Sequence, residues 1–194
     1  MKKKNKLMLK TFFKVMFKNQ EINSIIPQAY QKSIYDINYQ KLKEKEITTI
    51  FFDIDGTIAG VNNPIIPQKT IDLIEKLKKE FNILLISNNK EERVKPVANI
   101  LKVKYIFHAC KPEEEAFEKA LKLMNAQKEN TSMIGDQILT DIVGANKCGI
   151  YSILVKQLES KNNVQTSLAH KLQKYLIKKL ERKNLLKKEK FYMN

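Results

Sequence analysis

Residues 47–57 read ITTIFFDIDGT, and this stretch decides the fold. Ile47–Phe52 are β-branched or aromatic, which is typical of a buried strand in a parallel sheet. Asp53 and Asp55 follow where that strand ends, and their carboxylates project to the same side of an extended chain. Because like charges so close repel each other, they need a cation or a shared proton, and Mg²⁺ suits such oxygen ligands. Taken alone, the motif is also compatible with an ordinary turn at Gly56–Thr57.

Strand-like and helix-like segments alternate from residue 47 to residue 155. The pattern predicts an α/β fold in three layers, with a central parallel sheet covered by helices on both faces. Ligands of such sheets bind beyond the carboxyl ends of the strands. Short apolar runs predict further strands at residues 82–87, 105–108, 132–135 and 151–155. Helices are expected at residues 68–80, 91–101, 112–125 and 138–147.

Polar side chains stand at three more of the expected strand ends. The Ser87 hydroxyl, with Asn88 beside it, suits a phosphate oxygen, although Ser87 taken alone is more typical of a helix N-cap. Lys111 can neutralise an aspartate–phosphate cluster as a point charge. Asp136 ends a strand, and Asp141 follows just over one helical turn later, so both carboxylates can serve one cation. A helix cap at Asp136 and a surface position for Asp141 are the alternative.

The order DxDGT, Ser, Lys, GDxxxxD resembles the haloacid dehalogenase (HAD) superfamily. The stretches ILLISNNKEERV, KPEEEAF and IGDQILTDIVGANKCGIYSILV, with the DxDGT strand and its upstream segment, resemble YqeG-type phosphatases of subclass IIIA more closely. That family is related to mitochondrial phosphatidylglycerophosphate phosphatases, and the resemblance covers roughly residues 26–155. The chain departs from it at Gly56, where the family often has Asn.

The resemblance implies a Rossmann-like HAD fold and a Mg²⁺-dependent phosphomonoester hydrolase. Asp53 would be the nucleophile and a metal ligand. Asp55 would protonate the leaving alkoxide, then activate water, and would bind the metal through its backbone carbonyl. Thr57 would orient the two aspartates.

The same resemblance implies roles for the other polar residues. Ser87, Asn88 and Lys111 would bind the phosphoryl group. Asp136 would complete the metal site, and Asp141 would support it. Phosphoryl transfer is catalysed mainly by positioning and charge neutralisation, so this set is chemically coherent.

The spacing of the motifs leaves no room for a large cap domain. Asp55 and Ser87 are separated by a short loop and one helix, and Ser87 and Lys111 by one helix and one strand. We therefore expect an open site that admits a large or membrane-embedded substrate. Phosphatidylglycerophosphate is the substrate that the resemblance implies, and a soluble sugar phosphate or nucleotide is the alternative.

Two basic, amphipathic segments flank the expected core, giving a division into residues 1–46, 47–155 and 156–194. Lysines recur every four residues over 6–18, so a helix there would carry a cationic stripe and a broad apolar face. Such a helix predicts contact with an anionic membrane through residues 1–20. The alternative is that its apolar face packs on the domain.

The C-terminal segment carries leucines at every fourth position from Leu168 to Leu180, which predicts a helix. The pattern leaves open whether this helix packs on the sheet, contacts a partner helix or contacts a membrane.

The chain has 36 Lys and Arg against 21 Asp and Glu, a net charge of +15, which favours polyanionic partners. A basic RNA- or ribosome-binding protein on an idle HAD scaffold is a further alternative, although no aromatic stacking motif supports it. An AT-rich genome would also enrich lysine.

The two cysteines and two histidines exclude a disulfide framework and a zinc site. We expect a cytoplasmic protein, peripheral on the inner face of the membrane.

Overall fold

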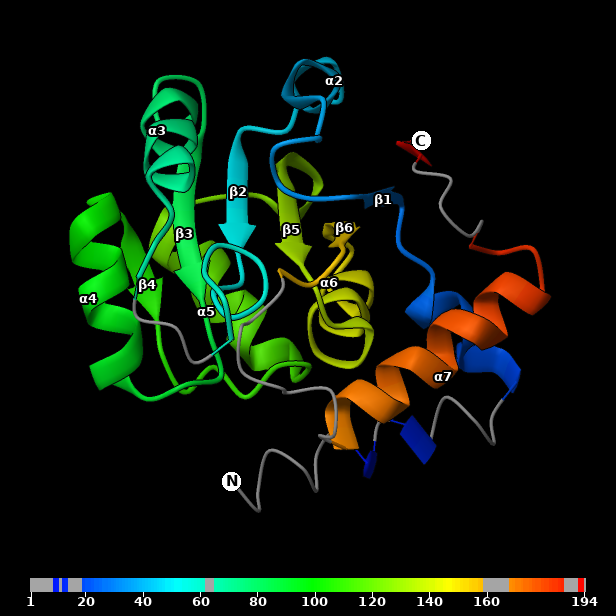
Figure 1. The fold of residues 1–194 in the computed structure, drawn as a ribbon. Coiled ribbons are helices and arrows are strands. Elements are labelled where there is room, and N and C mark those ends of the chain that lie inside the picture. Colours follow the sequence, from blue (N-terminus) through cyan, green and yellow to red (C-terminus); the bar gives the residue numbers. More distant parts are fainter. Residues whose placement is uncertain are drawn as a thin grey trace.

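A parallel sheet forms the centre of the structure, a computed structural model that describes residues 9–10, 12–13, 19–61, 65–158, 168–186 and 192–193. In this part of the chain the sheet has seven strands in the order β4-β3-β2-β5-β6-β1-β7 (Figure 1). Only β7 is antiparallel, at the edge beside β1. The strands are β1 (Ala29–Gln31), β2 (Thr49–Phe52), β3 (Asn82–Ile86), β4 (Lys104–Ile106), β5 (Thr131–Gly135), β6 (Tyr151–Val155) and β7 (Tyr192–Met193).

Strand β2 lies in the middle of the sheet, and every one of its residues is buried. Phe52 is in register with Leu85 of β3 and with Ile134 of β5, so the three strands end at the same level. The backbone N–H of Asp53 donates to the Ile134 carbonyl at 2.9 Å and extends the ladder by one residue. The carboxyl ends of β2, β3 and β5 therefore meet at one edge, as the sequence predicts.

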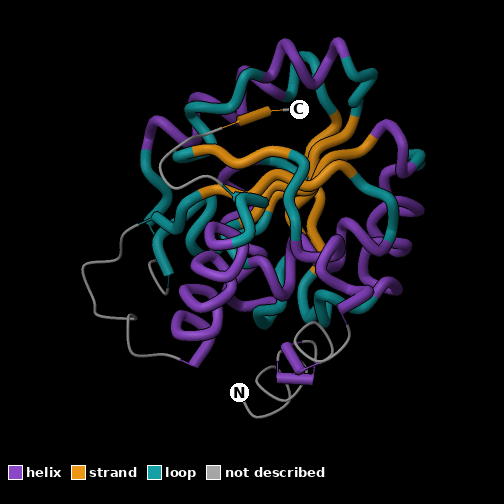
Figure 2. The backbone as a smooth tube through the Cα atoms, turned by 90° about the vertical axis from the view of Figure 1, so that its right-hand side faces the viewer, coloured by secondary structure: helices purple, strands orange, loops and turns teal. Residues whose placement is uncertain are grey.

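Neighbouring residues of β2 point to opposite faces, so Phe51 and Phe52 belong to different core clusters. Phe52 packs with residues of α3 and α4, and Phe51 with residues of α5 and α6. This confirms the three-layer α/β/α arrangement, and the view in Figure 2 shows the strands fanning out as a twisted sheet between helices. The helices are α3 (Gln68–Leu77), α4 (Glu91–Leu101), α5 (Glu114–Met124) and α6 (Val143–Lys147).

The expected helix over residues 138–147 begins as a π-helical turn, η3 (Ile138–Ile142), before it continues as α6. The wider turn holds Asp141 in the interior, with its side chain 1% exposed. Gly135 makes this possible, because a Cβ on it would lie 2.3 Å from the Asp141 carboxylate. Such single π-turns recur at functional sites in proteins.

The N-terminal segment supplies a strand that the sequence pattern does not indicate. Strand β1 pairs in parallel with β6, where Ala29 is in register with Ile153. The short helices η1 (Asn19–Ile25) and α2 (Tyr39–Glu44) flank it. The sheet therefore takes in residues before position 47, where the sequence pattern places a terminal extension. Three residues are too few to show a period-2 alternation, which explains why β1 was missed.

Helix α7 (Leu168–Arg182) packs on the domain, one of the three outcomes that its leucine pattern left open. Leu176 and Leu180 are buried against Ile138 and Ile142 of η3. Figure 1 shows α7 beside η1, on the side of the sheet that carries β6 and β1. Among the described helices, none combines the length and the apolar character needed to cross a membrane.

The N-terminal helix expected over residues 1–20 lies mostly outside the described residues. Of the described part, Phe12 packs on α7, with its ring 5.8 Å from that of Tyr175. Phe13 lies 5.9 Å from Phe12, and its side chain is 53% exposed.

No cap domain is inserted between the described strands. The connection from β2 to β3 contains a tight turn, in which Asp55 bridges to Ala59, and helix α3. The connection from β3 to β4 contains only α4. Among the described residues no cap domain therefore covers the carboxyl edge of the sheet, as the spacing of the motifs predicts, although Gln173 of helix α7 reaches this edge.

Candidate active site

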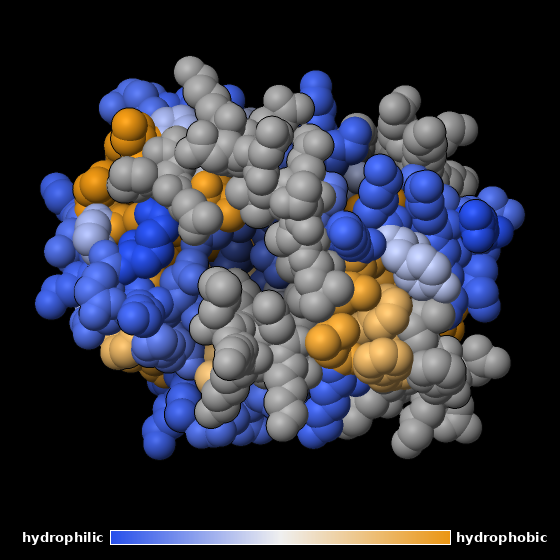
Figure 3. All heavy atoms as spheres, turned by 60° about the horizontal axis from the view of Figure 1, so that its bottom comes forward, coloured by the Kyte–Doolittle hydropathy of each residue, from blue (hydrophilic) through white to orange (hydrophobic). Residues whose placement is uncertain are grey.

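Four of the predicted residues lie around the carboxyl ends of neighbouring strands. Asp53 follows β2, Ser87 follows β3 and Asp136 follows β5, while Lys111 lies in the loop between β4 and α5. Figure 3 looks onto this end of the molecule and shows a hollow near its middle, among hydrophilic residues. The structure thus brings together side chains that are up to 83 positions apart because parallel strands end at a common edge.

Lys111 joins two carboxylates in the interior. Its Nζ lies 2.7 Å from Asp53 Oδ1 and 2.7 Å from Asp141 Oδ1, and it donates to the Ile86 carbonyl at 2.8 Å. The side chain of Lys111 is only 1% exposed. Burial by itself lowers the pKa of an ammonium group, but the negative charges of Asp141 and Asp53 outweigh it and raise the pKa of Lys111 above its ordinary value. Lys111 is therefore a fixed positive charge.

Three buried carboxylates could hold a metal ion. Asp53, Asp136 and Asp141 each offer an oxygen, and these atoms all lie within 4.8 Å of one another. Burial, and then the charges of Asp53 and Asp141, raise the pKa of Asp136 well above its ordinary value. Asp136 Oδ1 is buried and has no hydrogen-bond partner in the part of the chain that the structure describes. When the three carboxylates are ionised, the positive charge of Lys111 balances one of them and two negative charges remain. These charges, together with the unsatisfied Asp136 Oδ1, fit a divalent cation.

The cluster contains both side chains that were predicted to bind the metal, Asp53 and Asp136, and one side chain more. Asp141, expected only in support, stands beside Asp53 and Asp136, and its Oδ2 accepts from the Gln137 N–H at 3.0 Å. The Asp55 carboxylate, in contrast, lies outside the group.

The carboxylate of Asp55 is held by two residues of the β3–α4 region. Arg93 donates to its Oδ1 from Nη2 at 2.8 Å and from Nε at 3.2 Å. The Asn89 side-chain amide donates to its Oδ2. Neither Arg93 nor Asn89 was expected at the site, although both lie within seven residues of the strand end at Ile86. Their position after a central strand is the signal that could have indicated them.

Ser87 and Asn88 follow the end of β3, and their side chains contact different parts of the chain. Ser87 is 2% exposed, and its Oγ accepts from the Asn89 N–H at 3.2 Å. It is not the N-cap of α4, because that position belongs to Lys90. The Asn88 side chain forms a reciprocal pair with the Lys111 backbone, donating to its carbonyl at 2.9 Å and accepting from its N–H at 2.7 Å. Asn88 thus positions the loop that carries Lys111, a role that the sequence does not reveal.

Thr57 lies directly beyond the DxD motif and is 1% exposed. Its hydroxyl has no hydrogen-bond partner among the described residues. The structure therefore contains no contact through which this hydroxyl orients the aspartates.

Two glutamines from the C-terminal part of the chain hold Asp136. Gln157 donates from Nε2 to Asp136 Oδ2 at 2.9 Å. Gln173, on α7, donates to the Asp136 carbonyl at 2.7 Å and accepts from the Ile138 N–H at 2.9 Å. No local sequence pattern could have found them, since they lie 21 and 37 residues away from Asp136. Helix α7 therefore supports the acidic cluster as well as the core.

The cavity at this site is small. Its volume is ≈ 20 Å³, and Asp53, Asp55, Ser87, Lys111, Gln137 and Thr140 are among the residues that line it. This is room for about one water molecule. The site in this structure is therefore narrower than the open site expected from the spacing of the motifs.

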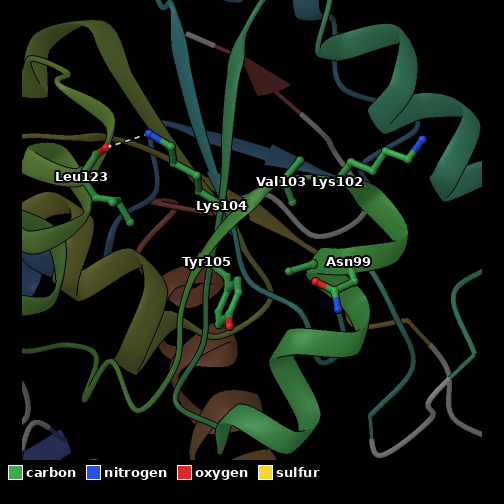
Figure 4. Close-up of a pocket in the computed structure, with 7 residues that line it drawn as sticks. Asn99, Lys102, Val103, Lys104, Tyr105 and Leu123 are labelled. Carbon is green, nitrogen blue, oxygen red and sulfur yellow. Dashed lines mark hydrogen bonds between the residues drawn. The ribbon is translucent and has the colours of Figure 1, made fainter.

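A larger cavity of ≈ 700 Å³ lies elsewhere, beside the edge strand β4. Figure 4 shows Lys104 reaching across to the Leu123 carbonyl of α5, with which its ammonium makes a hydrogen bond of 3.2 Å. Asn99 and Tyr105 lie on the α4 side of the same cavity. No carboxylate lines it, so the acidic chemistry belongs to the smaller site.

Two features require a glycine at position 56: the backbone conformation there and the close approach of Asp136. Its φ of +92° favours glycine, and a Cβ would lie 2.5 Å from Asp136 Oδ2. We expect Gly56→Ala to lower the free energy of unfolding by about 1–3 kcal/mol and to weaken cation binding, because Asp136 must shift.

Gly149→Ala is the matched control for that substitution. Gly149 also has a positive φ, +70°, but a Cβ there would meet nothing closer than 3.6 Å. Gly149→Ala should destabilise the protein without changing its affinity for Mg²⁺. Urea unfolding measures the first effect, and calorimetric titration with Mg²⁺ measures the second. Equal cation affinities of the two variants would refute the role assigned to the contact with Asp136.

Acidic residues and a buried lysine lie at the carboxyl edge of the sheet in this three-layer α/β domain, and comparisons with known proteins assign the domain to a class of hydrolases. A family model described as "haloacid dehalogenase-like hydrolase" matches residues 50–111. A second, described as "HAD-hyrolase-like", matches residues 108–181. The chain is 33% identical over 159 residues to "Probable phosphatase YqeG" of Bacillus subtilis (strain 168), covering 81% of this chain and 92% of that protein.

Two further similarities are more distant. Phosphatidylglycerophosphate phosphatase 1, chloroplastic/mitochondrial, of Arabidopsis thaliana is 24% identical over 144 residues, 69% of this chain and 41% of that protein. The crystal structure of an uncharacterized protein from Listeria monocytogenes serotype 4b aligns with a TM-score of 0.50 at 20% identity, covering 60% of this chain and 85% of that one. The latter similarity supports the fold.

The chain therefore belongs to the haloacid dehalogenase-like hydrolases, and within them to the family of the YqeG-type phosphatases. The resemblance deduced from the motif order is confirmed.

Proposed function

We propose that the chain is a Mg²⁺-dependent phosphomonoester hydrolase that forms a covalent phosphoryl intermediate on Asp53. The observation that carries this proposal is the buried Lys111, which bridges Asp53 and Asp141 at 2.7 Å each beside an unsatisfied oxygen of Asp136. Burying these charges together is costly, and a cluster of perturbed titratable groups at a strand edge is typical of a catalytic site. The similarity to a probable phosphatase supports the same reaction class.

In the first half-reaction an oxygen of Asp53 attacks the phosphorus of the substrate. The bond between phosphorus and the ester oxygen breaks, and Asp55 donates a proton to the departing alkoxide. The Lys111 ammonium, held 2.7 Å from Asp53, neutralises negative charge on the phosphoryl group and on the nucleophile. The products of this step are the free alcohol and phosphorylated Asp53.

In the second half-reaction water attacks the phosphorus of phosphorylated Asp53. Asp55, now ionised, accepts a proton from the water, and the bond between phosphorus and the Asp53 oxygen breaks. Inorganic phosphate leaves, and Asp53 and Asp55 return to their starting forms. The Ser87 hydroxyl binds a phosphoryl oxygen, while Asn88 keeps the loop of Lys111 in place.

The metal site would be formed by the carboxylates of Asp53 and Asp136 and the backbone carbonyl of Asp55, with Asp141 beside them. A bound Mg²⁺ supplies charge neutralisation at the transferring phosphoryl group. Gln157 and Gln173 orient Asp136 toward this position.

For the substrate we propose a lipid phosphate, phosphatidylglycerophosphate. The absence of a cap domain among the described residues and the similarity to the Arabidopsis enzyme support this choice. The exposed rings of Phe13 and Tyr175, next to the lysines of α7, suit contact with an anionic membrane surface. In this proposal the protein is cytoplasmic and binds the inner face of the membrane, with residues 1–20 taking part.

A substrate panel tests the proposed function. We expect phosphate release from phosphatidylglycerophosphate in mixed micelles with Mg²⁺ and none with EDTA, and slower release from soluble sugar phosphates and nucleotides. Release from the soluble compounds alone would refute the lipid assignment. RNA binding without any Mg²⁺-dependent hydrolysis would favour an idle scaffold instead.

Flotation with phosphatidylglycerol liposomes tests the membrane contact separately. The full chain should float at low salt, and a chain that lacks residues 1–20 should float less. Equal flotation of the two would refute a role for the N-terminal segment.

A further inference from the structure

Asp55, the acid and base of the proposed reaction, is restrained in this structure. Arg93 donates two hydrogen bonds to its Oδ1, at 2.8 and 3.2 Å, and Asn89 donates to its Oδ2. Both carboxylate oxygens are thus engaged away from the acidic cluster. The cavity in front of Asp53 has a volume of only ≈ 20 Å³. Since proton transfer needs a carboxylate oxygen that is free to face the substrate, at least one of these contacts to Asp55 must be released in a productive complex.

Arg93 is the partner that a substrate can reach. It lies in the first turn of α4, and its side chain is 21% exposed, whereas Lys111 is 1% exposed and already bridges two carboxylates. A guanidinium group presents a planar fork of N–H donors that matches phosphate oxygens as well as a carboxylate. The N-terminal end of an 11-residue helix adds a weak preference for negative charge at this place.

We propose that Arg93 determines specificity: it holds the ionised Asp55 in the resting enzyme and moves to a second anionic group of the substrate. The freed Asp55 carboxylate then takes up a proton from water and donates it to the leaving alkoxide. This inference rests on the proposed function, because it assumes that Asp55 is the acid and base. The favoured substrates are phosphomonoesters that carry another phosphate close to the one removed.

The enzyme should prefer substrates with a second anionic group because they bind more tightly to the state in which Asp55 is released. A substrate with a second anion replaces the Arg93–Asp55 ion pair by another charge-assisted pair, so the release of Asp55 is compensated. A substrate with a single phosphate must break the ion pair without replacement. Since a ligand shifts an equilibrium only by its differential affinity for the two states, only the first kind of substrate favours the released state.

Two soluble substrates test the inference without any contribution from a membrane. Glycerophosphoglycerol phosphate carries a phosphodiester beside its phosphomonoester, and glycerol 3-phosphate carries the phosphomonoester alone. We expect the wild-type kcat/KM with Mg²⁺ to be about tenfold or more higher for the first. Arg93→Gln should remove this preference, mainly by raising KM for the two-anion substrate. Arg93→Lys should keep only part of the preference.

Lys95→Gln is the matched control, because it removes one positive charge from an exposed position of the same helix. It should leave the preference unchanged, and thermal unfolding should show that the Arg93 variants are folded. The inference is overturned if the wild type hydrolyses both substrates equally well. It is also overturned if Arg93→Gln lowers kcat for both by the same factor, which is the behaviour of a residue that only positions Asp55. Absence of Mg²⁺-dependent hydrolysis of any phosphomonoester would instead refute the proposed function, and the inference with it.

Discussion

Asp53→Asn is expected to lower kcat for phosphomonoester hydrolysis by a factor on the order of 10⁴ or more. The amide has the shape of the carboxylate, and its oxygen can still accept the hydrogen bond that Lys111 Nζ donates at 2.7 Å. It is, however, not nucleophilic toward phosphorus, so the covalent step is lost while the fold is kept. The measurement is the steady-state release of phosphate with saturating Mg²⁺.

Asp72→Asn is the control for that substitution, because Asp72 is an exposed aspartate on α3, remote in the fold from the strand ends. It should leave kcat within about twofold of the wild type, in line with the small effects of surface substitutions. If Asp53→Asn kept more than a few per cent of the wild-type kcat, water would be attacking the substrate directly, and Asp53 would serve only as a metal ligand.

Lys111→Met is expected to have the largest effect on stability. The substitution removes a charge that lies between two carboxylates, with its side chain 1% exposed. Asp53 and Asp141 would be left as uncompensated buried charges, which costs about 3–5 kcal/mol. The free energy of unfolding in urea, measured with EDTA, should fall by this amount, and Mg²⁺ should restore part of it by neutralising the cluster.

Lys119→Met provides the comparison for a lysine at the surface. Lys119 is paired with Glu115 at 2.7 Å, but the two side chains are 65% and 75% exposed. Loss of this solvent-screened pair should change the free energy of unfolding far less than the loss of Lys111 does. If the two lysine variants were equally stable in EDTA, the acidic cluster would not depend on Lys111, and the electrostatic argument for the site would fail.

The strand ends that carry Asp53, Ser87 and Asp136 were predictable from the sequence. Asp53 and Ser87 each follow a run of buried apolar residues that is typical of a central parallel strand, and Asp136 follows the shorter buried segment of residues 132–135. Parallel pairing then places their carboxyl ends at one edge whatever the details of the packing. The local sequence pattern and the parallel topology together are sufficient to predict where Asp53, Ser87 and Asp136 lie.

The remaining features depend on contacts between segments far apart in the chain. Strand β1 is only three residues long, and its place in the sheet is set by pairing with β6, 124 positions later. Gln173 reaches Asp136 because α7 packs on η3, which a leucine spacing does not specify. The ion pair of Asp55 and Arg93 depends on the directions of two side chains, one in the loop after β2 and one in the first turn of α4. Neither periodicity nor composition encodes such partners.

The most direct test of the account is to look for the phosphoryl group on Asp53 itself. Enzyme quenched in acid during turnover of a ³²P-labelled phosphomonoester, with Mg²⁺ present, should carry label that hydroxylamine removes, as an acyl phosphate requires. Proteolysis should place that label on the peptide containing Asp53, and the Asp53→Asn variant should carry none. Label on another residue, or no label in an enzyme that turns over its substrate, would contradict the account.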